Sequence, residues 1–158
     1  MTKRIGFACK YLHYKQNQPK KLLEELQRPL TERSTTVAWL NRQSKDVAEE
    51  RMWDIMVHNA AAAKRLVEYV GSLPAELRMV RLGSNQLPCA TQRDWSYFWQ
   101  RPDVIAYGER EYAKVGEAAR ALDVRLSMHP GQFCVLASDN NEIVKRSIEE
   151  FEYHATLI

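Results

Sequence analysis

Three times along this 158-residue chain, an apolar run that favours β-structure leads through a loop into a segment with helical periodicity. The three runs are Arg4–Cys9, Arg78–Leu82 and Val124–Met128. Strands that alternate with helices form parallel sheets, because each helix carries the chain back to the starting end of the next strand. This alternation constrains the fold more than any other feature, and it predicts an α/β protein with a parallel sheet.

Four segments have the apolar spacing of helices. The predicted helices cover Lys20–Gln27, about 47–70, about 103–122, and a stretch that begins near residue 140. The spacing turns Ile105 of the third helix toward the core, and likewise Val144, Ile148 and Phe151 of the fourth. Asp46 with Glu49, and Asp139 with Glu142, have the spacing of an N-terminal capping box, and Gly71 is placed to end the second helix.

The length of the repeating unit indicates the architecture. A (β/α)₈ or TIM barrel has about 250 residues, or roughly 31 for each βα unit. This chain supplies three clear units, and the first is enlarged by a polar, basic segment, Lys10–Lys45. The last helical pattern reaches Ile158 without a glycine or proline that would end it. We therefore expect residues 1–158 to form a single domain, a partial TIM-type barrel of three to four βα units, either a fragment or completed by another chain.

Composition narrows the class of protein. With 45% hydrophobic and 27% charged residues, the chain is typical of a soluble globular protein. No apolar segment approaches the ~20 residues of a transmembrane helix, and the N-terminal one is too short for a signal peptide, so we expect a cytoplasmic protein without a membrane partner. The net charge of +3 permits a polyanionic partner without requiring one. The cysteines Cys9, Cys89 and Cys134 contain no C-x-x-C pair and are expected to be reduced.

The segment RLSMHPGQF carries the clearest chemical signal. Its apolar run ends at Met128, and His129-Pro130-Gly131 then turns the chain. In parallel α/β folds, ligands bind beyond the carboxyl ends of the strands, and a neutral imidazole placed there is a good ligand for a divalent metal. From the residues alone, a histidine that only hydrogen-bonds at a strand end explains the pattern as well.

The chain resembles the UV-damage endonuclease family. The resemblance is carried by RLSMHPGQF together with IGFAC near the start, Thr35-Thr36, Val57-His-Asn59 and Arg81-Leu-Gly83. It covers most of the chain and implies a TIM barrel similar to that of endonuclease IV. It also implies a DNA-repair enzyme that uses divalent metals, most often Mn²⁺, to cut the backbone of damaged double-stranded DNA on the 5′ side of UV photoproducts.

The resemblance assigns roles to four residues. His129 matches a metal ligand of the family, Gln132 and Phe133 match a pair that probes the lesion, and Phe7 matches an aromatic residue that assists from the first strand. Phenylalanine at positions 7 and 133 keeps the stacking face but lacks the hydroxyl of the tyrosine common in the family. For both phenylalanines, packing in the core is the alternative.

Two departures from the family bear on activity. Gln92 stands where the family usually has a histidine ligand, and a neutral amide oxygen is a poor substitute, although Asp94 is close in sequence. The carboxylates and histidines that complete the metal cluster lie on later strands of the family, so this chain supplies no catalytic residues that we can name. We expect it not to cut DNA efficiently by itself. The alternative is a damaged-DNA-binding or interaction module without catalysis.

Other features have two readings each. The aromatic residues of Trp95–Trp99 either line a DNA-facing rim or cover the top of the barrel, and Arg81 is expected to pair with an interior carboxylate. His58 and His154 are expected to have structural roles on their helices. A partial barrel would also leave open strand edges and apolar surface, which predicts self-association or a complementing barrel half.

Overall fold

The computed structural model describes residues 3–13, 17–131 and 133–157. Its sheet has three parallel strands in the order β1-β2-β3, namely β1 (Phe7–Ala8), β2 (Met79–Leu82) and β3 (Arg125–Met128). In the register of the sheet, Val80 pairs with Phe7 on one side and with Leu126 on the other. The predicted parallel α/β fold is therefore confirmed. Closure into a barrel stays a prediction.

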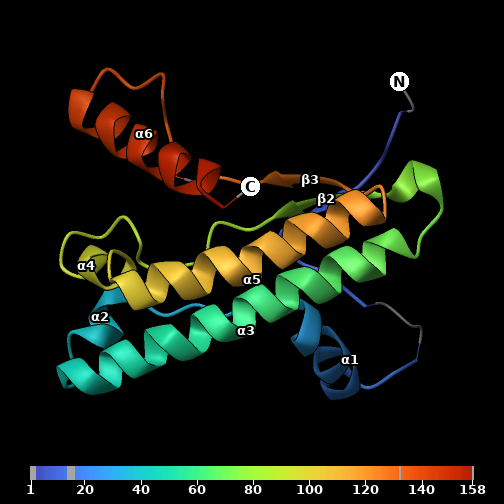
Figure 1. The fold of residues 1–158 in the computed structure, drawn as a ribbon, viewed down its shortest axis with the longest axis horizontal. Helices are drawn as coiled ribbons and strands as arrows, with labels where there is room; N and C mark the ends of the chain where they lie inside the picture. The colour runs from blue at the N-terminus through green and yellow to red at the C-terminus, as the bar shows by residue number, and fades with distance from the viewer. Residues whose placement is uncertain (1–2, 14–16, 132, 158) are drawn as a thin grey trace.

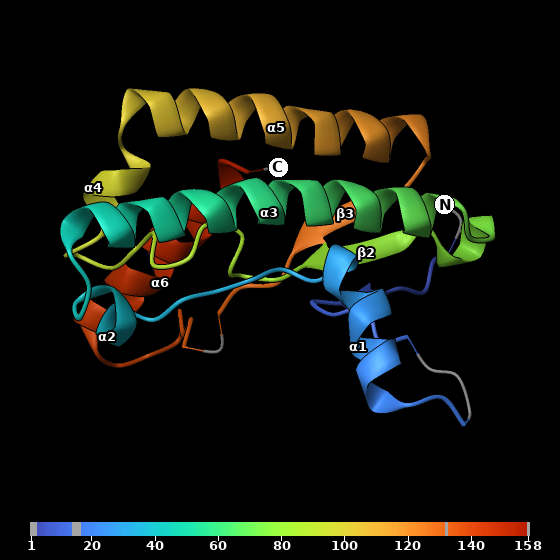
Figure 2. The same cartoon turned by 90° about the horizontal axis from the view of Figure 1, so that it is seen from below.

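Two long helices, α3 (Lys45–Gly71) and α5 (Pro102–Ala121), lie side by side against one face of the sheet (Figures 1 and 2). Alternate strand residues face this layer, so Val80 and Leu82 are buried while Arg81 between them is exposed. Side chains of both helices complete the main core, among them Leu66, Val67, Val70, Tyr112, Val115 and Ala119. Burial of this continuous apolar surface is the main force that holds the sheet to the helices.

The remaining elements are short or lie at the periphery. They are α1 (Lys20–Gln27), α2 (Val37–Leu40), α4 (Ser96–Trp99) and α6 (Asn141–Ala155), with 3₁₀ turns at Arg28–Leu30 and Ala75–Leu77. The first of these helices has the predicted bounds. None of the helices in the described part of the chain is long and apolar enough to cross a membrane.

A second apolar cluster joins α2 and the first turns of α3 to the aromatic segment around α4. Trp95, Phe98 and Trp99 are buried in it against Leu40 and Met52. The indole N–H of Trp95 donates to Asn41 Oδ1 at 2.8 Å, and that of Trp99 donates to Pro88 O at 3.1 Å. These aromatic residues therefore cover the core, in agreement with the second of the two readings.

The structure confirms where α3 ends and corrects the predicted caps. Gly71 is the last residue of α3, as predicted, but it does not take a left-handed conformation. Its missing side chain serves packing instead, because a Cβ there would lie 2.7 Å from the Cβ of Leu122. Ser44, not Asp46, is the N-cap residue of α3. The N-terminus of α6 is capped by Asn140, whose Oδ1 accepts the Glu142 N–H at 2.9 Å, so neither predicted capping box forms.

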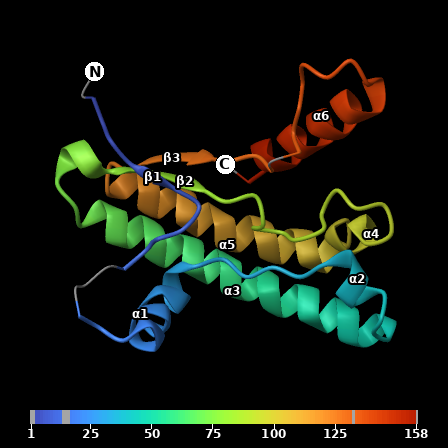
Figure 3. The same ribbon diagram turned by 180° about the vertical axis from the view of Figure 1, so that it is seen from behind.

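Parts of two predicted inward stripes are also corrected. In α5, Ile105 is exposed, although Tyr112, Val115 and Ala119 are buried as the helical spacing predicts. In α6, Ile148 and Phe151 are exposed. The face of α6 that is buried carries Ser147 and His154. The physical reason is the position of α6, which lies beyond the carboxyl ends of the strands and contacts polar loops rather than the apolar face of the sheet (Figure 3).

Candidate functional site

The carboxyl ends of the three strands meet at one edge of the sheet. Cys9, Gly83 and His129 are the first residues beyond β1, β2 and β3. The Cys9 N–H donates to Arg81 O at 2.9 Å and the His129 N–H donates to Leu82 O at 2.8 Å, so the ladder continues to this edge. Cys9 has a φ of 66°, which is uncommon for a residue with a side chain and is enriched at functional sites.

The ring of His129 is held by its own turn. Nδ1 lies 2.8 Å from Pro130 O, and because a carbonyl oxygen only accepts, Nδ1 carries the proton of this hydrogen bond. The lone pair of the neutral imidazole is then on Nε2. Metal-binding histidines are commonly oriented in this way, with one ring nitrogen donating to a carbonyl and the other left for the metal. His129 is half-buried, so its ring is not enclosed in the apolar core.

The residues predicted to contact DNA have different environments. Phe133 is 82% exposed, so it does not pack in the core formed by the described residues. Phe7 packs against the main core, with its ring 6.3 Å from that of Tyr11, as the packing alternative expects. Gln132 lies outside the described residues. Roles of these three residues in binding DNA stay predictions.

The expected ligand set is incomplete. Gln92 is exposed, and its backbone carbonyl is engaged by the N–H groups of Trp95 and Ser96 at 3.0 and 2.8 Å. Across residues 3–13, 17–131 and 133–157, no three side chains of His, Cys, Asp or Glu are grouped so as to hold a metal ion. The imidazole of His129 could serve as one ligand of a metal, and such a metal would need further ligands beyond this set. Arg81 also lacks the predicted carboxylate partner among the described residues and donates to Met128 O at 3.3 Å.

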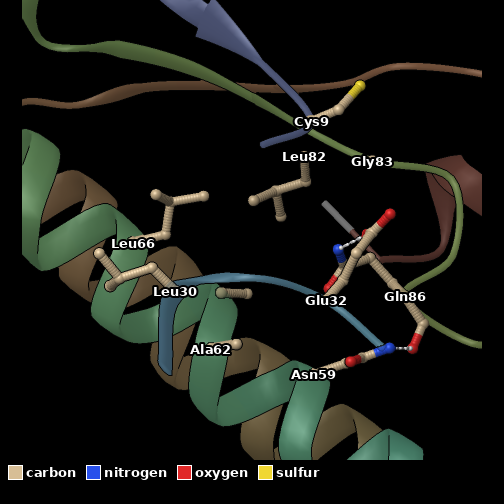
Figure 4. Close-up of a pocket in the computed structure, with 10 residues that line it drawn as sticks. Cys9, Leu30, Glu32, Asn59, Ala62, Leu66, Leu82, Gly83 and Gln86 are labelled. Carbon is tan, nitrogen blue, oxygen red and sulfur yellow. Dashed lines mark hydrogen bonds between the residues drawn. The ribbon is translucent and has the colours of Figure 1, made fainter. Parts of the chain in front are cut away.

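Sequence reasoning missed a polar network at the same edge, shown in Figure 4. The carboxylate of Glu32 lies against Gly83, where a Cβ would overlap it. It accepts hydrogen bonds from Gln86 Nε2 at 2.7 Å and from Asn85 Nδ2 at 3.2 Å. Burial raises the pKa of the Glu32 carboxyl, while the hydrogen bonds from Asn85 and Gln86 oppose that rise.

Asn59, on α3, holds the two loops of this network together. Its Oδ1 accepts the Arg33 N–H at 2.7 Å. Its Nδ2 donates to Arg33 O, Asn85 O and Gln86 O at 2.9, 2.8 and 3.1 Å. Asn59 is fully buried, so these contacts replace all of its hydration. The Tyr112 hydroxyl adds a contact at 3.2 Å to Gln86 Oε1. The side-chain amide of Asn59 thereby fixes the loop that carries Glu32 against the loop that follows β2.

The thiol of Cys9 borders a small cavity of about 10 Å³ beside Glu32 and Asn59. Burial raises the pKa of Cys9, and the neighbouring Glu32 carboxylate raises it further. A thiol with a raised pKa stays protonated and is a weak nucleophile. Cys9, Cys89 and Cys134 are all free, as predicted, and nothing in their surroundings favours covalent catalysis.

The other three histidines have different environments, and the structural roles predicted for His58 and His154 stay predictions. His13 Nδ1 lies 2.8 Å from the Tyr11 hydroxyl. His58 Nε2 lies 3.0 Å from Thr31 O, and burial lowers the pKa of His58. His154 is buried on α6, where burial lowers its pKa and the Glu150 carboxylate opposes that change. Of the four histidines, His129 is the one that directly follows a strand at the carboxyl edge of the sheet.

The fold is that of a parallel α/β protein, a class in which ligands commonly bind beyond the carboxyl ends of the strands, where His129 and the polar loops lie here. Comparison with known proteins identifies the family. The model of the UV-endonuclease UvdE family matches residues 3–158, and this chain belongs to that family.

Relatives and a solved structure agree with this assignment. The UV DNA damage endonuclease of Bacillus thuringiensis subsp. konkukian (strain 97-27) is 25% identical over 122 residues, which are 77% of this chain and 36% of that protein. The enzyme of Bacillus cereus (strain B4264) is 24% identical over 126 residues, 80% of this chain and 38% of its own. The crystal structure of SacUVDE has the same fold, with a TM-score of 0.70, 24% identity, and coverage of 98% of this chain and 44% of that chain. The chain thus spans less than half the length of these relatives.

Proposed function

We propose that this chain forms part of a metal-dependent DNA-repair endonuclease that hydrolyses the phosphodiester on the 5′ side of UV photoproducts, with Mn²⁺ as the metal. Membership of the UV-endonuclease family supports the substrate and the reaction. Because the chain spans 36% of a relative's length, we propose that it supplies the lesion-contacting rim and one metal ligand. Further ligands come from residues outside this chain, either from a continuation or from a complementing barrel half.

The observation that carries the proposal is the arrangement of His129 and Phe133 on one loop. The imidazole is anchored through Nδ1, which leaves Nε2 for a ligand, and the phenyl ring four residues later is almost fully exposed. A bound divalent cation would neutralise the phosphodiester and generate the attacking hydroxide from water. The chain's own contribution is to orient the imidazole and to present an aromatic face on which an unstacked base can rest.

Damaged DNA suits such a surface for a physical reason. A photoproduct weakens stacking, so turning the damaged bases out of the duplex costs less than it does in intact DNA. Stacking of a base on an aromatic side chain contributes about 1–3 kcal/mol. Because the cost of unstacking is lower in damaged DNA, stacking on Phe133 would favour the damaged duplex over the intact one, whatever its base sequence.

The second candidate is a damaged-DNA-binding module that has no catalytic activity. It is favoured by the incomplete set of metal ligands among the described residues and by the exposed Gln92 at the position of a family histidine. It shares the binding surface with the first candidate and differs only in the chemistry.

One experiment separates the two candidates. The protein expressed from its complete natural reading frame is mixed with UV-irradiated or untreated supercoiled plasmid, with and without Mn²⁺, alongside the His129→Ala variant. Nicking of irradiated plasmid that needs Mn²⁺ and is lost in the variant supports the endonuclease. Selective binding of irradiated DNA without nicking supports the binding module. If irradiated and untreated plasmid are bound alike and neither is cut, both proposals fail.

A further inference from the structure

Helix α6 buries the polar side of its surface. Ser147 and His154 are 1% and 4% exposed, whereas Ile148 and Phe151 are 45% and 41% exposed. Apolar burial would place an amphipathic helix with the opposite face inward. Specific polar contacts therefore decide how this helix lies, and they involve the loop that carries Phe133.

Ser147 holds the later part of that loop. Its Oγ accepts the Val135 N–H at 2.8 Å and donates its own proton to Ile143 O at 2.8 Å. A hydroxyl has a single proton to donate, and the bond to Ile143 uses it. The hydroxyl therefore presents its lone pairs to the loop, which fixes it as the acceptor for Val135.

Glu150, one turn further along α6, holds the earlier part. Its Oε1 accepts the Gly131 N–H at 3.3 Å and lies 3.5 Å from His154 Nε2. Its Oε2 accepts the Thr91 hydroxyl at 3.5 Å. One carboxylate thus joins the loop beyond β3 to the loop beyond β2. A Cβ on Gly131 would lie 3.2 Å from Oε1, a tight contact that a small shift of the carboxylate would relieve.

The helix that provides these contacts is itself fixed to the β2 loop. The Tyr153 hydroxyl accepts the Leu87 N–H at 2.7 Å. Burial raises the pKa of Tyr153 far above its ordinary range, so the hydroxyl stays neutral. Ser147 and Glu150 therefore project from a helix that is anchored independently of the Phe133 loop.

The two contacts fall on either side of Phe133 in the sequence. We propose that Ser147 and Glu150 are positioning residues that hold the backbone at Gly131 and Val135 so that the Phe133 ring stands clear of the protein. This inference rests on the proposed function, in which that ring contacts the lesion. Folding back onto apolar surface stabilises an exposed phenyl ring, and the exposed side chains of Val135 and Leu136 are close to it in sequence. Fixed anchors oppose that collapse and reduce the ordering cost of binding DNA.

The test uses Ser147→Ala and Glu150→Ala, which remove the two acceptors, with Glu149→Ala as the matched control. The exposed Glu149 precedes Glu150, so its variant loses the same charge from the same helix. Each variant is combined with Phe133→Trp and labelled with fluorotryptophan, so that fluorine NMR reports the mobility of the ring at position 133. The second measurement is binding to a duplex that carries a UV photoproduct, with Phe133 intact and in a Phe133→Ala background.

We expect the resonance from position 133 to broaden or shift in Ser147→Ala and Glu150→Ala but not in Glu149→Ala. Binding of the damaged duplex should weaken by about fivefold in each, the effect of losing one hydrogen bond, and this loss should vanish in the Phe133→Ala background. An unchanged resonance, or a loss that persists without Phe133, overturns the inference. If the parent does not distinguish damaged from intact duplex, the proposed function fails, while the NMR result still decides whether the two residues position the ring.

Discussion

Asn59 is the residue whose replacement tests the organisation of the site most severely. Asn59→Ala leaves the Arg33 N–H without its acceptor and removes the donor shared by Arg33 O, Asn85 O and Gln86 O. An unsatisfied buried polar group costs about 1–3 kcal/mol. The N–H and at least one carbonyl are expected to stay dry because Asn59 is fully buried, so the loss of stability should be about 3–5 kcal/mol.

That loss is a large part of the ~5–15 kcal/mol that stabilises a typical domain. Urea denaturation followed by circular dichroism measures it as a lower midpoint with an unchanged slope. In thermal unfolding, the same loss lowers Tm by roughly 6–20 °C. Asp54→Ala, on the exposed side of the same helix, is the control and should change stability by less than about 0.5 kcal/mol.

A second variant separates the hydrogen bonds from the size of the side chain. Asn59→Asp keeps the shape and the acceptor for the Arg33 N–H, but it points a carboxylate oxygen at three carbonyl oxygens. It should therefore destabilise the protein at neutral pH at least as much as Asn59→Ala does. If either variant unfolds within about 1 kcal/mol of the Asp54→Ala control, the network does not hold the loops and the reasoning is wrong.

Four further predictions concern packing, ionisation, binding and assembly. Gly71→Ala should lower the free energy of unfolding by about 1–3 kcal/mol, because its Cβ would meet Leu122. Gly108→Ala should raise it by up to about 1 kcal/mol, because a Cβ there meets nothing within 4 Å. Equal effects of the two variants in urea denaturation would contradict the packing argument. Burial raises the pKa of Glu32 above 4.5, so the folded state binds more protons than the unfolded state, and the resulting stabilisation is full below pH 4.5 and lost as pH rises through the folded pKa. The Tm of Glu32→Gln should therefore rise relative to that of the parent between pH 4.5 and 7. A difference in Tm that stays constant over this range would refute the burial of a charge. Phe133→Ala should leave Tm within about 2 °C of the parent, because the side chain is exposed. It should weaken binding of damaged duplex by about tenfold or more in a mobility-shift assay. Equal binding by the parent and the variant would show that this ring does not contact the lesion. Open strand edges at β1 and β3 and an exposed apolar surface predict that the isolated chain self-associates, which a monodisperse monomer in sedimentation would contradict.

The sequence predicted the layers of the fold well, because strand and helix periodicity are local signals. The bounds of α1 and the parallel order of the sheet required no knowledge of distant contacts. The helix ends were predicted less well. Glycine is a residue type that commonly ends helices, but at Gly71 the absence of a side chain is required by the close approach of Leu122, a residue far along the chain. A capping signal likewise does not tell which of several neighbouring polar residues supplies the cap, as Asn140 shows.

The candidate site was predicted in part. His129 was accessible to sequence reasoning because a histidine followed by Pro-Gly at a strand end is a local pattern. Glu32 was not, because it lies in a long polar segment and reaches Gly83 only through the fold. Asn59 did carry a signal. It occupies the apolar stripe of α3, three residues after Met56, and a polar side chain in such a stripe indicates a buried hydrogen-bond network.

The polar face of α6 was the largest error, and its cause is physical. Hydrophobic periodicity assigned Ile148 and Phe151 to the core. The helix is instead placed by hydrogen bonds that loop N–H groups donate to Ser147, Glu150 and Tyr153. Such contacts depend on where the loops lie in space, which periodicity does not encode. The exposed apolar residues of α6 are the ones that a complementing barrel half would cover, in line with the predicted self-association.

The central claim is that the imidazole of His129 offers Nε2 to a divalent metal at the carboxyl edge of the sheet. Electron paramagnetic resonance of Mn²⁺, titrated into the protein from its complete natural reading frame, measures binding directly. The account predicts that His129→Ala weakens Mn²⁺ affinity by about tenfold or more, while His58→Ala changes it little. Equal affinity of the parent and the His129→Ala variant for Mn²⁺ would contradict the account.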